Sequence, residues 1–135
     1  MATTTATITL NSTDLLSDEL ALSTTATLTS AGTSTGLTTA EGLSRKKTTS
    51  ASQYTLFSAS SFTDDKAHKV YLKNTETTAG LYFLVSIHDV EVGRLFAGDW
   101  AFIPWSADTT GDNADFKITP SSSASHTLEY MLFTD

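Results

Sequence analysis

Residues 93–105, GRLFAGDWAFIPW, hold the densest cluster of large apolar side chains in the chain and decide its fold class. A Gly-Asp step, which is typical of a turn, leads into a strand of aromatic residues. Because side chains alternate along a strand, Trp100 and Phe102 project to one face. Ile103 and Trp105 project to the other. A strand that is apolar on both faces belongs inside a sandwich or beneath a neighbouring subunit.

Similar strand signals continue on both sides of this segment. Seven short β-prone runs are separated by turn residues, at 53–59, 67–74, 81–88, 91–96, 99–104, 114–119 and 127–133. With no convincing amphipathic helix between them, these runs predict an all-β, antiparallel sandwich or barrel. Residues 81–87 are apolar at nearly every position, so we expect this strand to lie centrally.

The first 52 residues have a different composition. Ser and Thr make up 43 of the 135 residues, and 24 of them lie in residues 1–53, whereas all thirteen aromatic residues lie in 54–135. Aromatic side chains bring the largest buried area, so the second part can build a core. We therefore expect a Thr/Ser-rich N-terminal region at 1–52 and a β-sandwich core at 53–135. The first region is either a separate extended arm or the outer strands of the same sandwich.

Alternation within the N-terminal region favours strands over disorder. In Thr3–Leu10 the apolar residues fall on one face with threonines opposite, and a similar run begins at Leu20 and ends at Leu28. Thr13–Leu20 could start a single helical turn, and the glycines from Ser30 to Thr49 predict turns or a loose connector.

The charge and the absence of cysteine exclude several classes of protein. Eight basic and fifteen acidic residues give a net charge of −7, which repels nucleic acid and anionic membranes. Without cysteine there is no disulfide framework, thiolate nucleophile or iron–sulfur cluster. No apolar run is long enough to span a membrane, and the first residues lack the features of a secretory signal. We expect neither a nucleic-acid nor a membrane partner.

The sequence offers no convincing catalytic constellation. Its three histidines lack the close spacing of a metal site, so we expect no metal and no cofactor. Ser86, His88 and Asp89 are nearly adjacent, but Asp89 would point away from the other two, which disfavours a catalytic triad. We expect that the protein is not an enzyme.

The acidic segment 108–115 leaves two alternatives open. Its three carboxylates and one amide oxygen are ligands that calcium prefers, although their spacing misses that of an EF-hand. The simpler interpretation is a turn whose Asp and Asn side chains cap their own backbone.

Two features are candidates for contact with a partner. Arg45, Lys46 and Lys47 form the one cluster of basic residues, which either docks onto an acidic surface or lies in a solvated loop. Trp100 and Trp105 either pack in a core or interface, which we favour, or form a platform for a sugar ring.

The C-terminal eighty residues resemble small virion structural proteins of tailed bacteriophages, particularly those that infect marine cyanobacteria. The resemblance rests on residues 93–105 together with QYTLF (53–57), KAHKVYLKNT (66–75), FKITPS (116–121) and LEYMLF (128–133). It carries no catalytic residues. It implies a jelly-roll-like β-sandwich that attaches to the outside of a capsid as a decoration or cement protein, commonly as a trimer.

These observations lead to one expected function and one alternative. We expect a non-enzymatic protein that is made in the host cytoplasm and binds the major capsid protein or another virion protein on the outer surface of the particle. An extended Thr/Ser segment suits this role because it can add strands to a neighbour's sheet edge. The alternative is a carbohydrate-binding domain of a phage fibre or receptor-binding protein.

Overall fold

The computed structural model describes residues 4–13, 20–28, 37, 39–110 and 113–134. They form eleven β-strands and one short 3-10 helix, at Ala59–Ser61. The strands are β1 (Thr5–Ser12), β2 (Leu20–Thr27), β3 (Thr39–Ala40), β4 (Ser44–Thr48), β5 (Tyr54–Phe57), β6 (His68–Asn74), β7 (Tyr82–Ile87), β8 (Val90–Phe96), β9 (Trp100–Trp105), β10 (Phe116–Pro120) and β11 (His126–Thr134). The all-β prediction is confirmed, and all seven strands expected after residue 52 are present.

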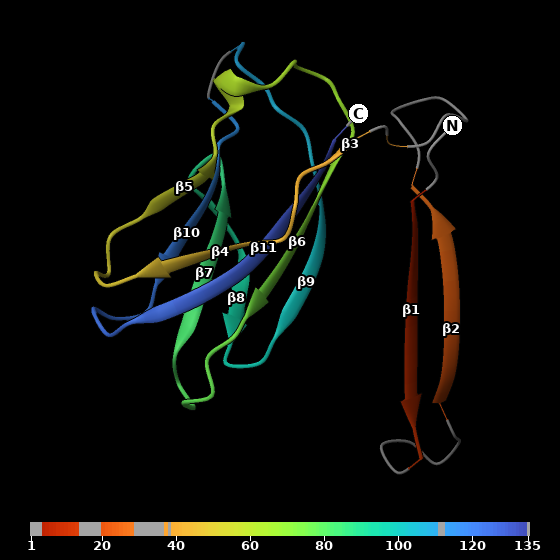
Figure 1. Ribbon diagram of the computed structural model, residues 1–135, viewed down its shortest axis with the longest axis horizontal. Helices are drawn as coiled ribbons and strands as arrows, with labels where there is room; N and C mark the ends of the chain where they lie inside the picture. Colours follow the sequence, from red (N-terminus) through yellow and green to blue (C-terminus); the bar gives the residue numbers. More distant parts are fainter. Residues whose placement is uncertain (1–3, 14–19, 29–36, 38, 111–112, 135) are drawn as a thin grey trace.

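Two antiparallel sheets pack face to face as a sandwich (Figure 1). The four-stranded sheet has the order β5-β10-β7-β8, and the five-stranded sheet has the order β3-β11-β6-β9, with β4 also paired to β11. β7 lies between two other strands, as its apolar sequence predicts. From β4 to β11, every connection except β7 to β8 changes sheet. That exception is a two-residue turn in which His88 and Asp89 both have positive φ, at 51° and 57°.

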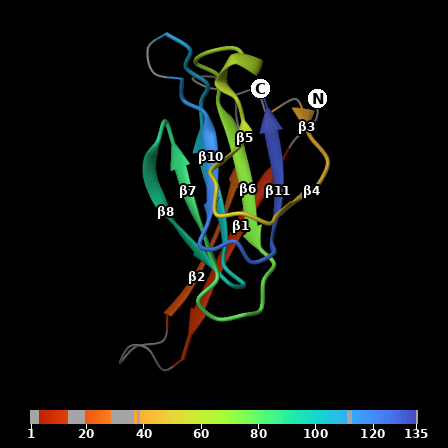
Figure 2. The same ribbon diagram turned by 90° about the vertical axis from the view of Figure 1, so that its left-hand side faces the viewer.

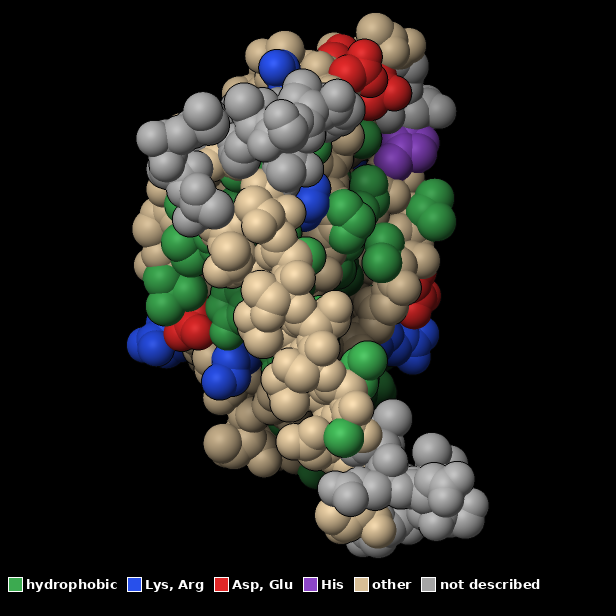
Figure 3. Space-filling model, turned by 90° about the vertical axis from the view of Figure 1, so that its right-hand side faces the viewer, with side chains coloured by type: hydrophobic (Ala, Val, Ile, Leu, Met, Phe, Trp, Pro, Cys, Tyr) green, Lys and Arg blue, Asp and Glu red, His purple; other side chains and the backbone are tan. Residues whose placement is uncertain are grey.

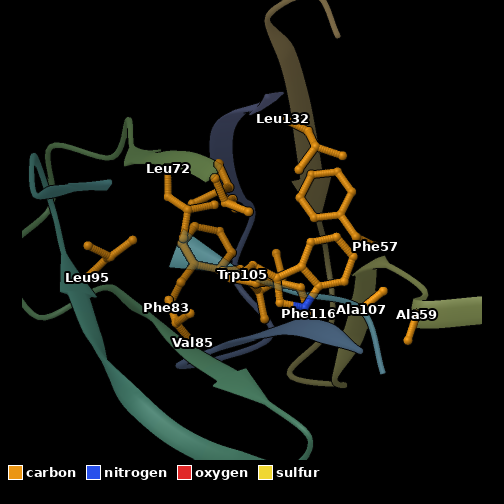
Figure 4. Close-up of a cluster of buried hydrophobic side chains, with 13 residues drawn as sticks. Phe57, Ala59, Leu72, Phe83, Val85, Leu95, Trp105, Ala107, Phe116 and Leu132 are labelled. Carbon is orange, nitrogen blue, oxygen red and sulfur yellow. The ribbon is translucent and has the colours of Figure 1, made fainter. Parts of the chain in front are cut away.

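The core lies between the two sheets and is rich in aromatic side chains (Figure 4). The ring of Phe57 lies 5.8 Å from that of Trp105 and 6.0 Å from that of Phe116. Val70, Leu72 and other inward residues of both sheets are fully buried around these rings. At about 1.5–3 kcal/mol for each large apolar side chain, burial of this cluster is the main stabilisation of the sandwich.

Asn74 joins the two sheets at one end of the core. Its side chain is fully buried, and its Nδ2 donates to the carbonyl oxygens of Leu81 at 3.3 Å and Leu95 at 3.0 Å. Its Oδ1 accepts from the backbone N–H of Glu76. Because buried polar groups require partners, this side chain fixes how the end of β6 meets the opposite sheet.

The Thr/Ser-rich region divides in two. β3 and β4 pair with β11 and are outer strands of the sandwich, so the basic cluster lies on a strand and not in a loop. β1 and β2 form a separate hairpin (Figures 1 and 2), which stands on the side of the five-stranded sheet that faces away from the core. The helical turn considered at Thr13–Leu20 falls almost entirely outside the described residues.

Candidate interaction surface

The outer face of the five-stranded sheet brings together residues that are far apart in the sequence. Glu129 of β11 pairs with Arg45 of β4 on one side and with Lys73 of β6 on the other, and Lys73 in turn pairs with Trp100 of β9. Residues directly opposite each other in paired strands share a face of the sheet. Arg45, Glu129, Lys73 and Trp100 therefore form one row across four strands.

This outer face is positively charged although the chain is acidic. The same pairing places Lys47 and Lys69 on it, so that it carries four of the eight basic residues. Within the described strands of this sheet, Glu129 is the one acidic residue. Four positive charges and one negative charge contrast with a net charge of −7 for the whole chain. The face is suited to an acidic partner surface.

Glu129 holds the centre of the row together. Both Nε and Nη2 of Arg45 donate to its Oε2, at 3.2 and 3.1 Å. The neighbouring Tyr71 has its pKa raised, first by burial and then by the charge of Glu129 and a hydrogen bond to it. The Tyr71 hydroxyl therefore stays neutral and donates to the carboxylate. Arg45 is largely exposed, so this ion pair contributes little stability, but it orients the guanidinium on the surface.

Aromatic side chains complete the surface. Trp100 is 56% exposed at the end of the row, and the rings of Phe102 and Phe133 lie 5.9 Å apart on the same face. Tryptophan, tyrosine and arginine are the residues that most often dominate binding at protein interfaces. A face that combines them with lysines has the composition of a binding surface.

Of the five residues predicted to contact a partner, Lys46 and Trp105 do not lie on this outer face. The Trp105 side chain is 4% exposed, packs among the core rings and donates from Nε1 to the carbonyl oxygen of Ala114 at 2.8 Å. Lys46 lies over the ring of Tyr54 at 5.0 Å, on the opposite side of β4 from its two basic neighbours. Both sit at strand positions that alternate away from the outer face.

The β1–β2 hairpin has one apolar and one hydroxyl face. Its register places Ala6 opposite Ala26 and Leu10 opposite Leu22, with Ile8 between them, while the other face pairs threonines such as Thr7 and Thr25, whose hydroxyls lie 2.8 Å apart. The register of the two strands is unbroken over eight residue pairs. The large apolar side chains stay open to solvent: Ile8 is 39%, Leu10 48% and Leu22 47% exposed.

The hairpin crosses in front of the outer face of the five-stranded sheet. Figure 3 looks onto it from outside, and the side turned to the viewer consists mainly of backbone and polar side chains. The exposed apolar face of the hairpin and the outer face of the five-stranded sheet are therefore two candidate interaction surfaces.

Ser86, His88 and Asp89 are not arranged as a catalytic triad. Ser86 is buried on β7, and the carboxylate of Asp89 accepts a hydrogen bond from Lys117 at 2.9 Å. In a catalytic triad that carboxylate would hold the imidazole of His88 instead. Nδ1 of His88 lies 3.3 Å from the carbonyl oxygen of Asn113.

The described carboxylates of the acidic segment cap backbone and hydroxyl groups. Asp108 Oδ1 accepts from the backbone N–H and the hydroxyl of Thr110 at 2.9 and 2.7 Å, and Asp115 Oδ1 accepts from the backbone N–H of Ala59 at 2.8 Å. These hydrogen bonds lower the pKa of Asp108. Among the described residues, which leave out Gly111 and Asp112, no three acidic or histidine side chains are grouped as metal ligands.

Lys69, Tyr71, Lys73, Glu129 and Phe133 lie on this face but were not among the residues predicted to contact a partner. The run HKVYLKN alternates so that Lys69, Tyr71 and Lys73 share a face, and this signal was available in the sequence. That the same face also carries Arg45 and Trp100 depends on strand pairing, which the alternation does not specify.

Comparison of the chain with known protein families, with curated proteins and with solved structures finds no match in any of the three. No helix in the described part of the chain is long and apolar enough to cross a membrane.

Proposed function

We propose that this chain is a non-enzymatic structural protein that binds the outside of a phage capsid and stabilises or decorates it. Its partner would be the major capsid protein or another virion protein. The observation that carries the proposal is the β1–β2 hairpin, which stands outside the sandwich and keeps Ile8, Leu10 and Leu22 exposed.

A two-stranded hairpin is at best marginally stable in water without a surface to cover its apolar side. The hairpin contains no charged residue in its described strands, and its large apolar side chains remain about half open to solvent. A neighbouring protein that covered them would stabilise the hairpin and gain apolar contact at the same time. If several copies of the chain were joined in one oligomer, the many identical sites on one particle would multiply a modest single affinity.

The arrangement of the strands supports a jelly roll. Taken in chain order from β4 to β11, the first, eighth, third and sixth strands make one sheet, and the second, seventh, fourth and fifth make the other. Two interlocked Greek keys of eight strands have this order, and viral capsid and lectin domains often use it. A jelly roll does not by itself give a function, because the same fold serves many unrelated functions.

The direct test is binding to purified particles by co-sedimentation. We expect the triple variant Ile8→Thr, Leu10→Thr, Leu22→Thr to lose binding, because it removes the large apolar side chains of this face. Threonine is β-branched and suits a strand, so the hairpin itself should be preserved. The matched control is Thr7→Ser, Thr9→Ser, Thr25→Ser on the other face, which should bind as the native chain does. If the triple variant bound particles as well as the native chain does, the hairpin would be excluded as the attachment device.

A second candidate, a carbohydrate-binding domain of a fibre or receptor-binding protein, is favoured by one observation. Trp100 is 56% exposed, and an exposed indole can serve as a platform for a sugar ring. Lys73 lies directly opposite it and could donate hydrogen bonds to the sugar hydroxyls. Binding to a glycan array distinguishes the two candidates. If Trp100→Ala abolished binding of the chain to glycans and left its binding to particles unchanged, the carbohydrate function would be favoured.

A further inference from the structure

β8 is an exposed edge strand on the side of the sandwich away from β4 and β5. It pairs with β7, and in the described part of the chain no strand pairs with its other edge. Val90 and Val92 are 64% and 51% exposed along it, and Phe96 is 46% exposed at its end. Long exposed edge strands with apolar side chains readily pair with another chain, and proteins usually protect them.

An apolar groove runs beside this edge, between β8 and β9. Its volume is about 180 Å³, and it is lined by Val85, Val92, Gly93, Arg94, Leu95, Ala101 and Ile103. The groove reaches the surface where the two sheets separate. A side chain that entered it from outside would bury apolar area against both sheets.

Gly93 lines the groove, and nothing within the chain requires a glycine there. Its φ lies outside the positive range, and a Cβ at this position would meet no atom within 4 Å. A glycine inside a strand weakens the strand and often marks a bulge or the close approach of another group. The bulge in β8 is at Val92, which is the residue left without a partner between Glu91 and Gly93 in the pairing with β7.

The charges of β8 are self-complementary about this position. If two copies of β8 paired antiparallel with the two-fold axis between Val92 and Gly93, Glu91 of each copy would lie opposite Arg94 of the other. Glu91 and Arg94 already share a face, since their side chains form an ion pair at 3.0 Å within one chain. Opposite charges directly across a strand pair stabilise it. The same register places the Val92 side chain of one copy against the empty position at Gly93 of the other.

We propose that β8 is the interface for a second copy of this chain, paired antiparallel in that register. The two four-stranded sheets then form one continuous eight-stranded sheet, and Val92 of each copy fills the groove of the other at Gly93. This pairing is two-fold and makes a dimer, in contrast to the trimer that the resemblance implies. It goes beyond the capsid proposal and does not depend on it.

The first test fills the groove. The solution mass of the native chain, measured over a range of concentrations, should reach twice 14.4 kDa. Gly93→Val should remain folded, because its Cβ has open space, but should lower the dimer affinity by roughly a hundredfold, since Val92 can no longer enter. Gly42→Val is the matched control: this glycine also has open space and a φ outside the positive range, but it lies between β3 and β4. The Gly42→Val variant should dimerise as the native chain does.

The second test uses the charges and separates the interface from the ion pair within one chain. Glu91→Arg gives a chain with two positive charges on the edge, and Arg94→Glu gives one with two negative charges. Each alone should dimerise roughly tenfold more weakly than the native chain, because like charges face each other. Mixed together, they should form a heterodimer, although both have lost the ion pair within the chain.

Three results would overturn the proposal: a native chain that stays monomeric at every concentration, a native trimer, or a dimer that Gly93→Val leaves unchanged. Absence of a heterodimer from the charge variants would exclude this register.

Discussion

Lys73 lies directly across the strand pair from Trp100, on the outer face of the five-stranded sheet. Arg45 and Glu129 continue the same row, so a basic surface with an exposed indole at its end is set into an acidic protein. The row depends on the pairing of four strands, and its members can be changed without touching the core, since all face away from it. Surface substitutions of this kind usually change stability by less than about 0.5 kcal/mol.

Reversing one charge of the row should weaken attachment. Lys73→Glu is expected to reduce binding to purified particles and to leave the melting temperature nearly unchanged, because Lys73 is exposed. Lys66→Glu makes the same change in net charge outside the strands of the row and serves as the control. Co-sedimentation at low and high salt measures the effect. If both variants bound equally well, the row would have no part in attachment.

The two tryptophans should differ sharply in their effect on stability. Trp105→Ala removes a ring from the core and should lower the free energy of unfolding by about 3–5 kcal/mol. Trp100→Ala removes an exposed ring and should lower it by less than about 1 kcal/mol. Urea denaturation of both variants measures this difference. A large loss for Trp100→Ala would place that side chain in a packed environment and contradict its exposure.

Asn74 should be important for stability although it is polar. Asn74→Ala leaves the carbonyl oxygens of Leu81 and Leu95 without this donor, and should cost about 1–3 kcal/mol of unfolding free energy. Asn11→Ala, on the exposed face of β1, is the control and should have little effect. Thermal unfolding compares the two. Equal stability of both variants would mean that water replaces the Asn74 amide without cost.

The Asp89–Lys117 ion pair predicts a small dependence on pH. The Lys117 ammonium donates a hydrogen bond to Asp89 and holds the pKa of that carboxyl below its usual value. Since the folded pKa is the lower one, the pair stabilises the fold above about pH 4, and this contribution is lost as pH falls through the folded pKa. Lys117→Gln should raise the pKa of Asp89, as followed by NMR titration, whereas Lys73→Gln should not. A pKa of Asp89 that Lys117→Gln did not move would contradict the pairing.

Local patterns were sufficient to predict the strands after residue 52, but not β4 and not how the strands pair. Alternation in 127–133 and the continuous apolar run in 81–87 depend on neighbours in sequence, and both strands form as expected. Arg45–Lys47 shows neither apolar alternation nor an apolar run. The sequence therefore predicted a connector for this basic cluster and not a strand. It became a strand by pairing with β11, more than seventy residues away. The burial of Trp105 and the exposure of Trp100 follow from the same kind of long-range contact.

Strand pairing also decides which N-terminal residues can be removed without damage to the sandwich, because β3 and β4 pair with β11. A deletion of all residues to 50 would strip β3 and β4 from β11 and expose the edge of the sandwich. A deletion of residues 1–37 removes the hairpin and keeps both strands. We expect this shorter deletion to leave a folded sandwich, with a cooperative unfolding transition that circular dichroism can follow. Loss of that transition would show that the hairpin is part of the folding unit.

The central claim is that this chain belongs to the outer surface of a phage particle. Electron microscopy of particles purified from an infected culture that makes the chain tests it most directly, comparing the native chain with the 1–37 deletion. We predict density for the sandwich at regular positions on the outside of the capsid with the native chain, and its absence with the deletion. Particles that carry no copies of the native chain would contradict the account.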